Sequence, residues 1–366
     1  MRKGEERVHN GHAGPLLRAG GTKASEAAIM VSMAETFRAD EAVELAQYVR
    51  GEFIESRHIG SAVVIGPDDE TLVQLGNTTA PVFARSTVKP FQAIAAMELR
   101  VPLRGPQVAL AAASHSGSLE HQDVVRGMLA KAGLTPEDLR CPAAWPEDEA
   151  AKEEALRSGL GQTRLAFNCS GKHAAFLWAC TENDWDTETY LDPEHPVQQR
   201  VAKVIEEYTQ EKPSAWSVDG CGAPVPAVSL RGLAAAFSTL AQSRLDLSRN
   251  ARAMTVATTM LDYPWAVQGH GLPNTVVMED LGVIAKLGAE GLLVLGAEDG
   301  TAVALKVLDG SQRATTMVGV SLLAAVGAIS QEQAGGVLSK VMKPVMGGEQ
   351  PVGSLRLGEP VADLFR

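Results

Sequence analysis

The chain has 366 residues, of which 45% are hydrophobic and 21% charged, proportions typical of a globular protein. Its formal net charge is −11 and no stripe of clustered Lys and Arg occurs, which argues against nucleic acid or an anionic membrane as a partner. Four cysteines are too few for a disulfide framework, and no segment has the pattern of a signal peptide or a membrane span. These features predict a cytoplasmic protein whose thiols are free for packing or for metal.

The beginning of the chain differs in composition from the rest. Residues 1–33 are polar, Gly-rich and basic, which predicts a disordered N-terminal extension. Residues 34–366 are expected to form the folded domain, with regular structure beginning near Glu55.

Predicted strands and helices alternate irregularly along that domain. The β-rich runs "HIGSAVVIG" and "ETLVQLGN", separated by "PDDE", predict a hairpin. Helices are expected over "FQAIAAMEL", "HQDVVRGMLAKAG" and "PEDEAAKEEALRSG", then over residues 174–179, 197–208, 230–241 and 249–261, whereas "VALAAA" fits either a short strand or a helix. Apolar runs at 283–287, 292–295 and 302–307 predict a β-meander, and a helix is expected over 315–329.

This order of elements indicates a fold class. A doubly wound parallel sheet requires regular β-α alternation, which is absent from the pattern. We therefore predict an α+β fold, in which an antiparallel sheet built from both ends of the chain is flanked by helices.

The segment "RSTVKP" places Ser86 and Lys89 three residues apart. On a helical turn such residues are neighbours, so the amine can reach the hydroxyl. A desolvated lysine is neutral enough to take the proton of a serine and make it a nucleophile. The spacing alone is a weak signal, because most S-x-x-K matches are solvated helix faces.

Two later motifs strengthen this interpretation. "ASHSG" places Ser114 where a buried run meets a loop, and "VIAKLGAEGLLVL" places Lys286 in an apolar run just before a glycine. The order of S-x-x-K, a serine-rich loop and K-x-G is the layout of penicillin-recognising serine enzymes. The plain alternatives are a loop serine and an outward-facing strand lysine, but the apolar surroundings of Lys286 favour a pocket.

Cysteines occur in two glycine-containing loops. "NCSGKH" holds Cys169 and Lys172 at the start of an apolar helix, and "DGCGAP" holds Cys221. Two loop cysteines far apart in sequence are not a zinc finger, which has close pairs. They are either small buried residues, as we assign Cys141 and Cys180, or metal ligands on shaped loops.

The motifs "ARSTVKPFQ", "ASHSG", "NCSGKHAA", "DGCGAP" and "AKLGA" together resemble those of the rhizobial-type (class 3) L-asparaginases, the L-asparaginase II family. The resemblance runs from about Glu55 to Lys286. It implies a fold similar to serine β-lactamases and glutaminases, hydrolysis of L-asparagine to L-aspartate and ammonia, and a homodimer. Residues 34–366 are then an amidohydrolase domain.

The same resemblance implies a role for ten residues and a zinc ion. They are Ser86, Lys89, Ser114 and Lys286 as two Ser-Lys catalytic tandems, Arg85, His173 and Asp219 for substrate, and Cys169, Lys172 and Cys221 for one zinc per chain, structural or substrate-positioning. A lysine that binds zinc must be neutral, which burial and the charge of the metal both favour.

The leading hypothesis is an L-asparaginase in which Ser86 attacks the side-chain amide with Lys89 as base, while Ser114 and Lys286 relay protons to the leaving ammonia. The roles of the two tandems are open to exchange. A glutaminase or a penicillin-recognising hydrolase is the enzymatic alternative. A non-catalytic amino-acid-binding relative and a zinc-scaffold protein are further alternatives, but neither requires two base-activated serines.

Overall fold

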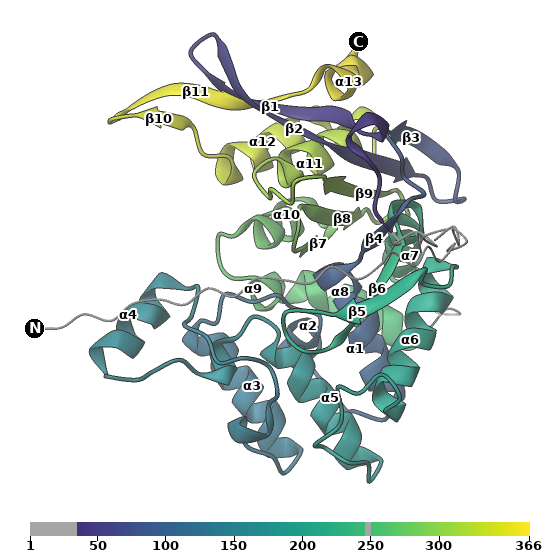
Figure 1. Ribbon diagram of the computed structural model, residues 1–366, viewed down its shortest axis with the longest axis vertical. Coiled ribbons are helices and arrows are strands. Elements are labelled where there is room, and N and C mark those ends of the chain that lie inside the picture. Colours follow the sequence, from purple (N-terminus) through teal and green to yellow (C-terminus); the bar gives the residue numbers. More distant parts are fainter. Residues whose placement is uncertain (1–34, 246–249) are drawn as a thin grey trace, which may run out of the picture. The chain divides into compact units, whose positions relative to one another are not determined.

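One large antiparallel sheet takes strands from both ends of the chain (Figure 1) in the computed structural model, which describes residues 35–245 and 250–366. The strand order is β10-β11-β1-β2-β9-β8-β7, and β3 also pairs with β2. The strands are β1 (Val43–Arg50), β2 (Phe53–Ile65), β3 (Thr71–Leu75), β7 (Ile284–Gly288), β8 (Leu292–Gly296), β9 (Ala302–Val307), β10 (Val345–Gly347) and β11 (Gln350–Leu357). The predicted α+β class, with its antiparallel sheet and flanking helices, is confirmed.

Helices α7 (Leu230–Gln242) and α11 (Thr315–Ala325) cover opposite faces of this sheet. On β8, a Cβ added at Gly296 would meet the Phe237 backbone of α7, whereas Leu293 and Leu295 touch Gly319 of α11. Successive side chains of a strand point to opposite faces, so each helix covers one face. Both faces of β8 are therefore buried, which explains its uninterrupted apolar sequence.

The remaining large helices form a second body of the domain, drawn below the sheet in Figure 1. Helix α5 packs against α1, α2 and α3, and its residues 170–180 are all buried, as expected of a helix that is apolar on every side. The helices of this body are α1 (Lys89–Glu98), α2 (Pro106–Ala111), α3 (Leu119–Lys131), α4 (Glu149–Arg157), α5 (Ser170–Glu182), α6 (Pro196–Thr209), α8 (Ala251–Asp262) and α9 (Pro264–Val267). Three others lie at the sheet: α10 (Pro273–Leu281) packs against β7, α13 (Glu359–Ala362) against β1, and α12 (Gln331–Val341) against α10 and α11.

A second, smaller sheet includes the segment that leads into α1. Its strands β4 (Pro81–Phe83), β6 (Pro224–Ser229) and β5 (Ala215–Val218) lie in the order β4-β6-β5, all antiparallel. The strand β4 leads directly into the one-turn 3-10 helix η2 (Arg85–Val88), which precedes α1. The sequence patterns did not indicate this sheet.

Several predicted elements are confirmed and one expectation is wrong. The β2–β3 hairpin and the β7–β8–β9 meander are present with antiparallel pairing, and the first four residues of "VALAAA" are helical, in α2. Regular structure begins at Ala39 and β1 at Val43, rather than near Glu55. β1 forms a hairpin with β2 and pairs on its other side with β11, a distant partner that a local pattern does not reveal. The predicted disordered extension, residues 1–33, lies outside the described residues.

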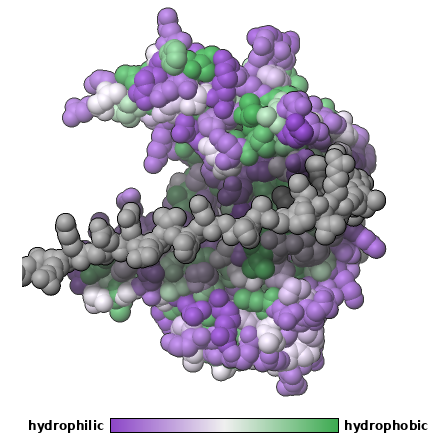
Figure 2. Space-filling view, viewed as in Figure 1, coloured by the Kyte–Doolittle hydropathy of each residue, from purple (hydrophilic) through white to green (hydrophobic). Residues whose placement is uncertain are grey.

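The face of the molecule seen in Figure 2 is mainly hydrophilic outside the grey residues. Exposed large hydrophobic side chains such as Phe53, Leu160 and Val218 come from separate elements or loops. Within residues 35–245 and 250–366, no helix is both long and apolar enough to cross a membrane.

Candidate active site

The segment from Arg85 to Lys89 turns from strand β4 into helix α1. Arg85 has a positive φ of 47°, a left-handed conformation that is unfavourable for a residue with a side chain. Such strain is common at functional sites, where the surrounding structure holds the backbone in place. Ser86 follows in η2 and is half-buried, and Lys89 begins α1 with only 1% of its surface exposed. Pro90 lies in the first turn, where its missing N–H costs little.

Two buried lysines meet at the hydroxyl of Ser114. The Lys89 Nζ lies 2.9 Å from Ser114 Oγ and 2.6 Å from the carbonyl oxygen of Ala113. From strand β7, the Lys286 Nζ lies 2.8 Å from the same Ser114 Oγ and 2.9 Å from the carbonyl oxygen of Leu287. The Ser114 hydroxyl therefore bridges two amines that come from opposite ends of the sequence.

The surroundings of Lys286 make its amine a proton acceptor. Its side chain is completely buried, and burial together with the charge of Lys89 lowers the pKa of Lys286 well below its ordinary value. A neutral amine has a lone pair that can accept a hydrogen bond from the Ser114 hydroxyl. The Lys89 amine can meanwhile donate to the same oxygen. This arrangement gives the serine proton a place to go.

The pairing differs in part from the two separate tandems that the resemblance implies. Lys286 contacts Ser114, but Lys89 also bonds to Ser114, and no side-chain hydrogen bond joins Ser86 to any residue within 35–245 and 250–366. The amine of Lys89 reaches past its own turn to the end of α2. Ser86, Lys89, Ser114 and Lys286 thus belong to one region that shares Lys89. Sequence spacing could not reveal this, because it depends on where α2 ends.

A buried histidine that the sequence analysis did not single out supports the Ser114 loop. The His115 Nδ1 accepts a bond of 3.1 Å from the Gly117 N–H, so its Nε2–H donates to Ser170 Oγ at 2.9 Å. Ser170 in turn donates to the Leu165 carbonyl at 2.8 Å. Burial lowers the pKa of His115 well below its ordinary value, so the ring is neutral. His115 therefore connects the residue after Ser114 to the first turn of α5.

His121 caps helix α3. Its Nδ1 lies 2.7 Å from Ser118 Oγ, its backbone N–H donates to the same Ser118 oxygen, and its Nε2 lies 2.9 Å from the carbonyl oxygen of Trp265. All the polar atoms of the ring are engaged in this capping arrangement.

The loop residues Cys169, Lys172 and Cys221 also come together in a buried group. The Lys172 Nζ lies 3.1 Å from Cys221 Sγ, and both cysteines are almost fully buried. Hydrogen bonding between the two thiols, helped by Lys172, lowers the pKa of Cys221 and raises that of Cys169. Burial alone would lower the pKa of Lys172, but the neighbouring sulfurs raise it above its ordinary value. Without metal, the group is a thiolate paired with an ammonium.

This donor set fits a zinc ion. Zinc prefers thiolate and nitrogen ligands, and bond lengths of about 2.3 and 2.0 Å in a tetrahedral site place sulfur and nitrogen donors roughly 3.5 Å apart. The 3.1 Å between Lys172 Nζ and Cys221 Sγ is close to that value. No group of three His, Cys, Asp or Glu suited to a metal occurs in the described part of the chain, so the third donor would be the lysine. Cys180, assigned to packing, is buried in α5, bonded to neither cysteine.

The predicted substrate residues Arg85 and Asp219 form an ion pair. The Arg85 Nε donates to Asp219 Oδ1 at 2.8 Å, and the two side chains are 24% and 14% exposed. Asp219 lies two residues from Cys221, so the ion pair adjoins the cysteine group. One cation and one anion that face each other can be exchanged for the opposite charges of an amino-acid zwitterion.

The third predicted substrate residue, His173, is completely buried. Its Nδ1 lies 2.7 Å from the hydroxyl of Tyr190, which accepts from the Arg140 N–H. Burial lowers the pKa of His173 to about 4, so the ring is neutral at neutral pH. Its Nε2 has no hydrogen-bond acceptor in the described ranges and lies on the side of Cys221. His173 therefore adjoins the cysteine group more closely than the Ser-Lys group.

Comparisons with known proteins give the family of the chain. The chain matches the family model of L-asparaginase II over residues 46–357, most of its length. No curated protein matches the chain. Similar solved structures include the β-lactamase Mb2281c from Mycobacterium bovis (16% identity, 72% of this chain and 94% of that chain covered, TM-score 0.40). They also include Mglu in its glutamate form (12%, 75% and 62%, 0.43) and a Bacillus glutaminase (14%, 73% and 89%, 0.34).

Proposed function

Because the chain belongs to the L-asparaginase II family, whose members are hydrolases that act on amides, we propose that it hydrolyses L-asparagine to L-aspartate and ammonia through a serine nucleophile. The observation that carries the proposal is the Ser114 hydroxyl held between the amines of Lys89 and Lys286. A chain that only binds amino acids has no need of a serine with a neutral amine on one side.

Ser86 is the proposed nucleophile. Its hydroxyl is free of hydrogen bonds to the described residues and lies one turn before Lys89. Once Lys89 has passed a proton through Ser114 to the neutral amine of Lys286, the Lys89 amine accepts the Ser86 proton as the oxygen attacks the side-chain carbonyl carbon. Ser114 links Lys89 to Lys286 and relays a proton to the amide nitrogen, so that the C–N bond breaks and ammonia leaves. Water then hydrolyses the aspartyl ester and regenerates the serine. In the exchanged assignment, Ser114 attacks and Lys286 is the base.

Recognition of the substrate is proposed to use the Arg85–Asp219 pair. A guanidinium binds a carboxylate, in bidentate form where geometry allows, and a carboxylate binds an ammonium. When the zwitterion enters, Arg85 takes the α-carboxylate and Asp219 the α-ammonium, at the cost of the 2.8 Å bond between them. This exchange requires a free amino acid, so asparagine within a peptide is expected to be a poor substrate.

Zinc is proposed to bind Cys169, Lys172 and Cys221. When bound, a zinc ion with three protein ligands supplies a Lewis-acid position for water or substrate. The chain's own contribution there is to hold two sulfurs and one amine together. One of the sulfurs, that of Cys221, is two residues from Asp219 in the sequence.

Trapping the intermediate tests the serine mechanism directly. Rapid quenching during turnover of L-asparagine, followed by intact mass and digestion, is expected to find an aspartyl adduct on Ser86 that is absent in Ser86→Ala. An adduct on Ser114 would exchange the roles of the two serines. Full activity in both Ser86→Ala and Ser114→Ala would refute a serine nucleophile altogether.

Substrate choice is tested by measuring ammonia release from L-asparagine and L-glutamine, with hydrolysis of a chromogenic cephalosporin in parallel. We expect the highest kcat/KM for L-asparagine. Preference for glutamine or the cephalosporin would favour one of the other hydrolases considered above. Light scattering of the purified protein tests the homodimer that the family implies, and cell fractionation tests the cytoplasmic location expected from the sequence.

A further inference from the structure

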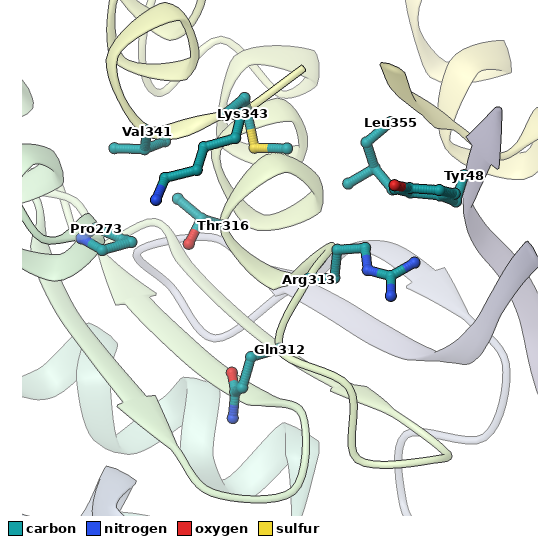
Figure 3. A pocket seen from close by; sticks show the side chains of 9 residues that line it. Tyr48, Pro273, Gln312, Arg313, Thr316, Val341, Lys343 and Leu355 are labelled. Carbon is teal, nitrogen blue, oxygen red and sulfur yellow. The ribbon is translucent and has the colours of Figure 1, made fainter. Parts of the chain in front are cut away.

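A second cavity lies apart from the catalytic lysines, between the β1–β11 part of the sheet and helices α10, α11 and α12 (Figure 3). Its volume is about 220 Å³. The side chains around it include Tyr48, Pro273, Arg313, Thr316, Lys343 and Leu355. No role in amide hydrolysis accounts for this combination.

The charge of the cavity is positive. Arg313 and Lys343 both line it, and no Asp or Glu is among the described residues that do so. Neither cation forms an ion pair with a carboxylate within residues 35–245 and 250–366, although the chain as a whole carries a net charge of −11. The guanidinium of Arg313 is held 4.4 Å above the ring of Tyr48. Both cations are exposed at the mouth of the cavity, so they are available to pair with an anion that enters it.

Helix α11 begins at this cavity with several donors that lack acceptors. Its N-cap is Ala314, which has no side chain to cap the helix. The N–H groups of Thr316 and Met317 have no acceptor among the described residues. A helix N-terminus carries a partial positive charge that favours anions.

The side chain of Thr316 is an independent indication of a ligand. Only 8% of Thr316 is exposed, but its hydroxyl bonds to no residue that the structure describes and is open to the cavity. Figure 3 shows Thr316 and the Lys343 amine on the same side of the cavity, with Arg313 and Tyr48 on the other. Because this hydroxyl has no partner among the described residues and opens into the cavity, it is free to donate a hydrogen bond to a bound group.

We infer that this cavity is a binding site for a small anion that carries a carboxylate or phosphate group. The anionic group lies at Thr316, the free N–H groups of α11 and Lys343. Arg313, on its Tyr48 support, takes a second negative group at the other end of the cavity. The inference is independent of the amide chemistry, since none of these residues belongs to the catalytic group.

Isothermal titration calorimetry of the full chain with inorganic phosphate and, separately, with succinate tests this inference. Succinate lacks the ammonium group that Asp219 is proposed to bind, which weakens its binding at the substrate site, and the variants below distinguish the two sites. We expect saturable binding of at least one anion. Binding of phosphate alone identifies a phosphorylated ligand, and binding of succinate alone a carboxylate ligand.

Three variants locate the binding. Thr316→Val keeps the shape of the side chain and removes the hydroxyl, and Lys343→Met removes the charge; each should weaken binding about tenfold or more, the loss of one charge-assisted or buried hydrogen bond. Lys131→Met, an exposed lysine of α3 without an ion pair, is the matched control and should bind normally. Absence of saturable binding of either anion, or equal binding by all three variants, overturns the inference.

Discussion

Two buried lysines in this protein have opposite electrostatic surroundings. Lys286 contacts a hydroxyl and a carbonyl and lies near the charge of Lys89, and its pKa falls well below the ordinary value. Lys172 is equally inaccessible, but it contacts the sulfur of Cys221, and its pKa rises. Burial disfavours the charge of both amines, so the neighbours decide the outcome. The first lysine is suited to accept protons, and the second is suited to balance a thiolate until a metal replaces its proton.

The largest effect is expected from removing the amine of Lys286. Lys286→Met leaves the Ser114 hydroxyl without its neutral acceptor, so kcat for L-asparagine should fall about ten-thousandfold, the upper range of general acid–base catalysis. Lys306→Met is the matched control, since Lys306 is a buried strand lysine that bonds to the Glu290 and Val307 carbonyls. Steady-state kinetics that showed equal losses in both variants would contradict a specific role of Lys286.

Replacing a cysteine should disrupt the group around Lys172, the second lysine of this comparison. Cys169→Ser and Cys221→Ser should each lose the proposed zinc, about one ion per chain, whereas the buried packing cysteine variant Cys180→Ser should keep it. Because the thiols and the amine must lose protons to bind metal, occupancy should fall as the pH is lowered. Elemental analysis of the purified variants provides the measurement. Equal zinc in all of them would exclude this site.

The difference between the surroundings of Lys286 and those of Lys172 could be predicted only in part from the sequence. Local patterns, S-x-x-K, K-x-G and the glycine-rich loops, drew attention to the serines, lysines and loop cysteines, whereas the roles expected of the ten residues came from the family resemblance. The sequence predicted Lys89 as the partner of Ser86, since three residues separate them. In the folded protein the Lys89 amine bonds to Ser114. This contact depends on where helix α2 ends and on where strand β7 lies in the fold, which sequence spacing does not determine. The role of His115 was missed for the same reason: its partner Ser170 is 55 residues away.

The main sheet shows the same limit. Strands β2, β3, β7, β8 and β9 have strongly apolar or alternating sequences and were expected. By contrast, β10 and β11 expose many residues, and β1 is only partly buried. The pairing of β1 with β11 joins residues about 300 positions apart, such as Ala46 and Leu357, which leaves no local signal, so this edge of the sheet could not be predicted.

Asp219 belongs to the negatively charged surroundings of Lys172, since its charge also helps to raise the pKa of that lysine. Asp219→Ala removes the partner of the substrate ammonium and frees Arg85. KM for L-asparagine should rise about tenfold to a hundredfold, the range for a charge-assisted hydrogen bond, with a smaller change in kcat. Glu298→Ala, which removes an exposed partner of Arg244, is a control of equal charge. An unchanged KM would refute the assignment.

The neutral state of Lys286 should also reduce stability at neutral pH. Its pKa in the folded protein lies below the unfolded value of about 10.4, so the unfolded chain binds more protons and stability rises with pH up to that value. Lys286→Met should therefore be more stable than wild type by about 1 kcal/mol or more at pH 7. Urea unfolding at pH 7 and pH 10 should show this difference decreasing at the higher pH. A Met variant that is less stable at both values would contradict the neutral amine.

The smallest effect is expected from Gln312, which supports the Lys286 strand from outside. Its side-chain amide donates to the carbonyl of Gly288, two residues after Lys286 at the end of β7. In Gln312→Ala this carbonyl loses its partner and the end of the strand is held less firmly, so the Lys286 amine spends less time at Ser114. One neutral hydrogen bond contributes about 1 kcal/mol, which predicts a loss of about fivefold in kcat with KM unchanged. Gln199→Ala is the matched control. The side-chain amide of Gln199, on α6, also donates to a backbone carbonyl, that of Pro193, but this pair is far from β7 in the sequence. If both variants keep full activity, the position of Lys286 does not depend on Gly288, and the packing of β7 between its neighbours is sufficient to hold the amine.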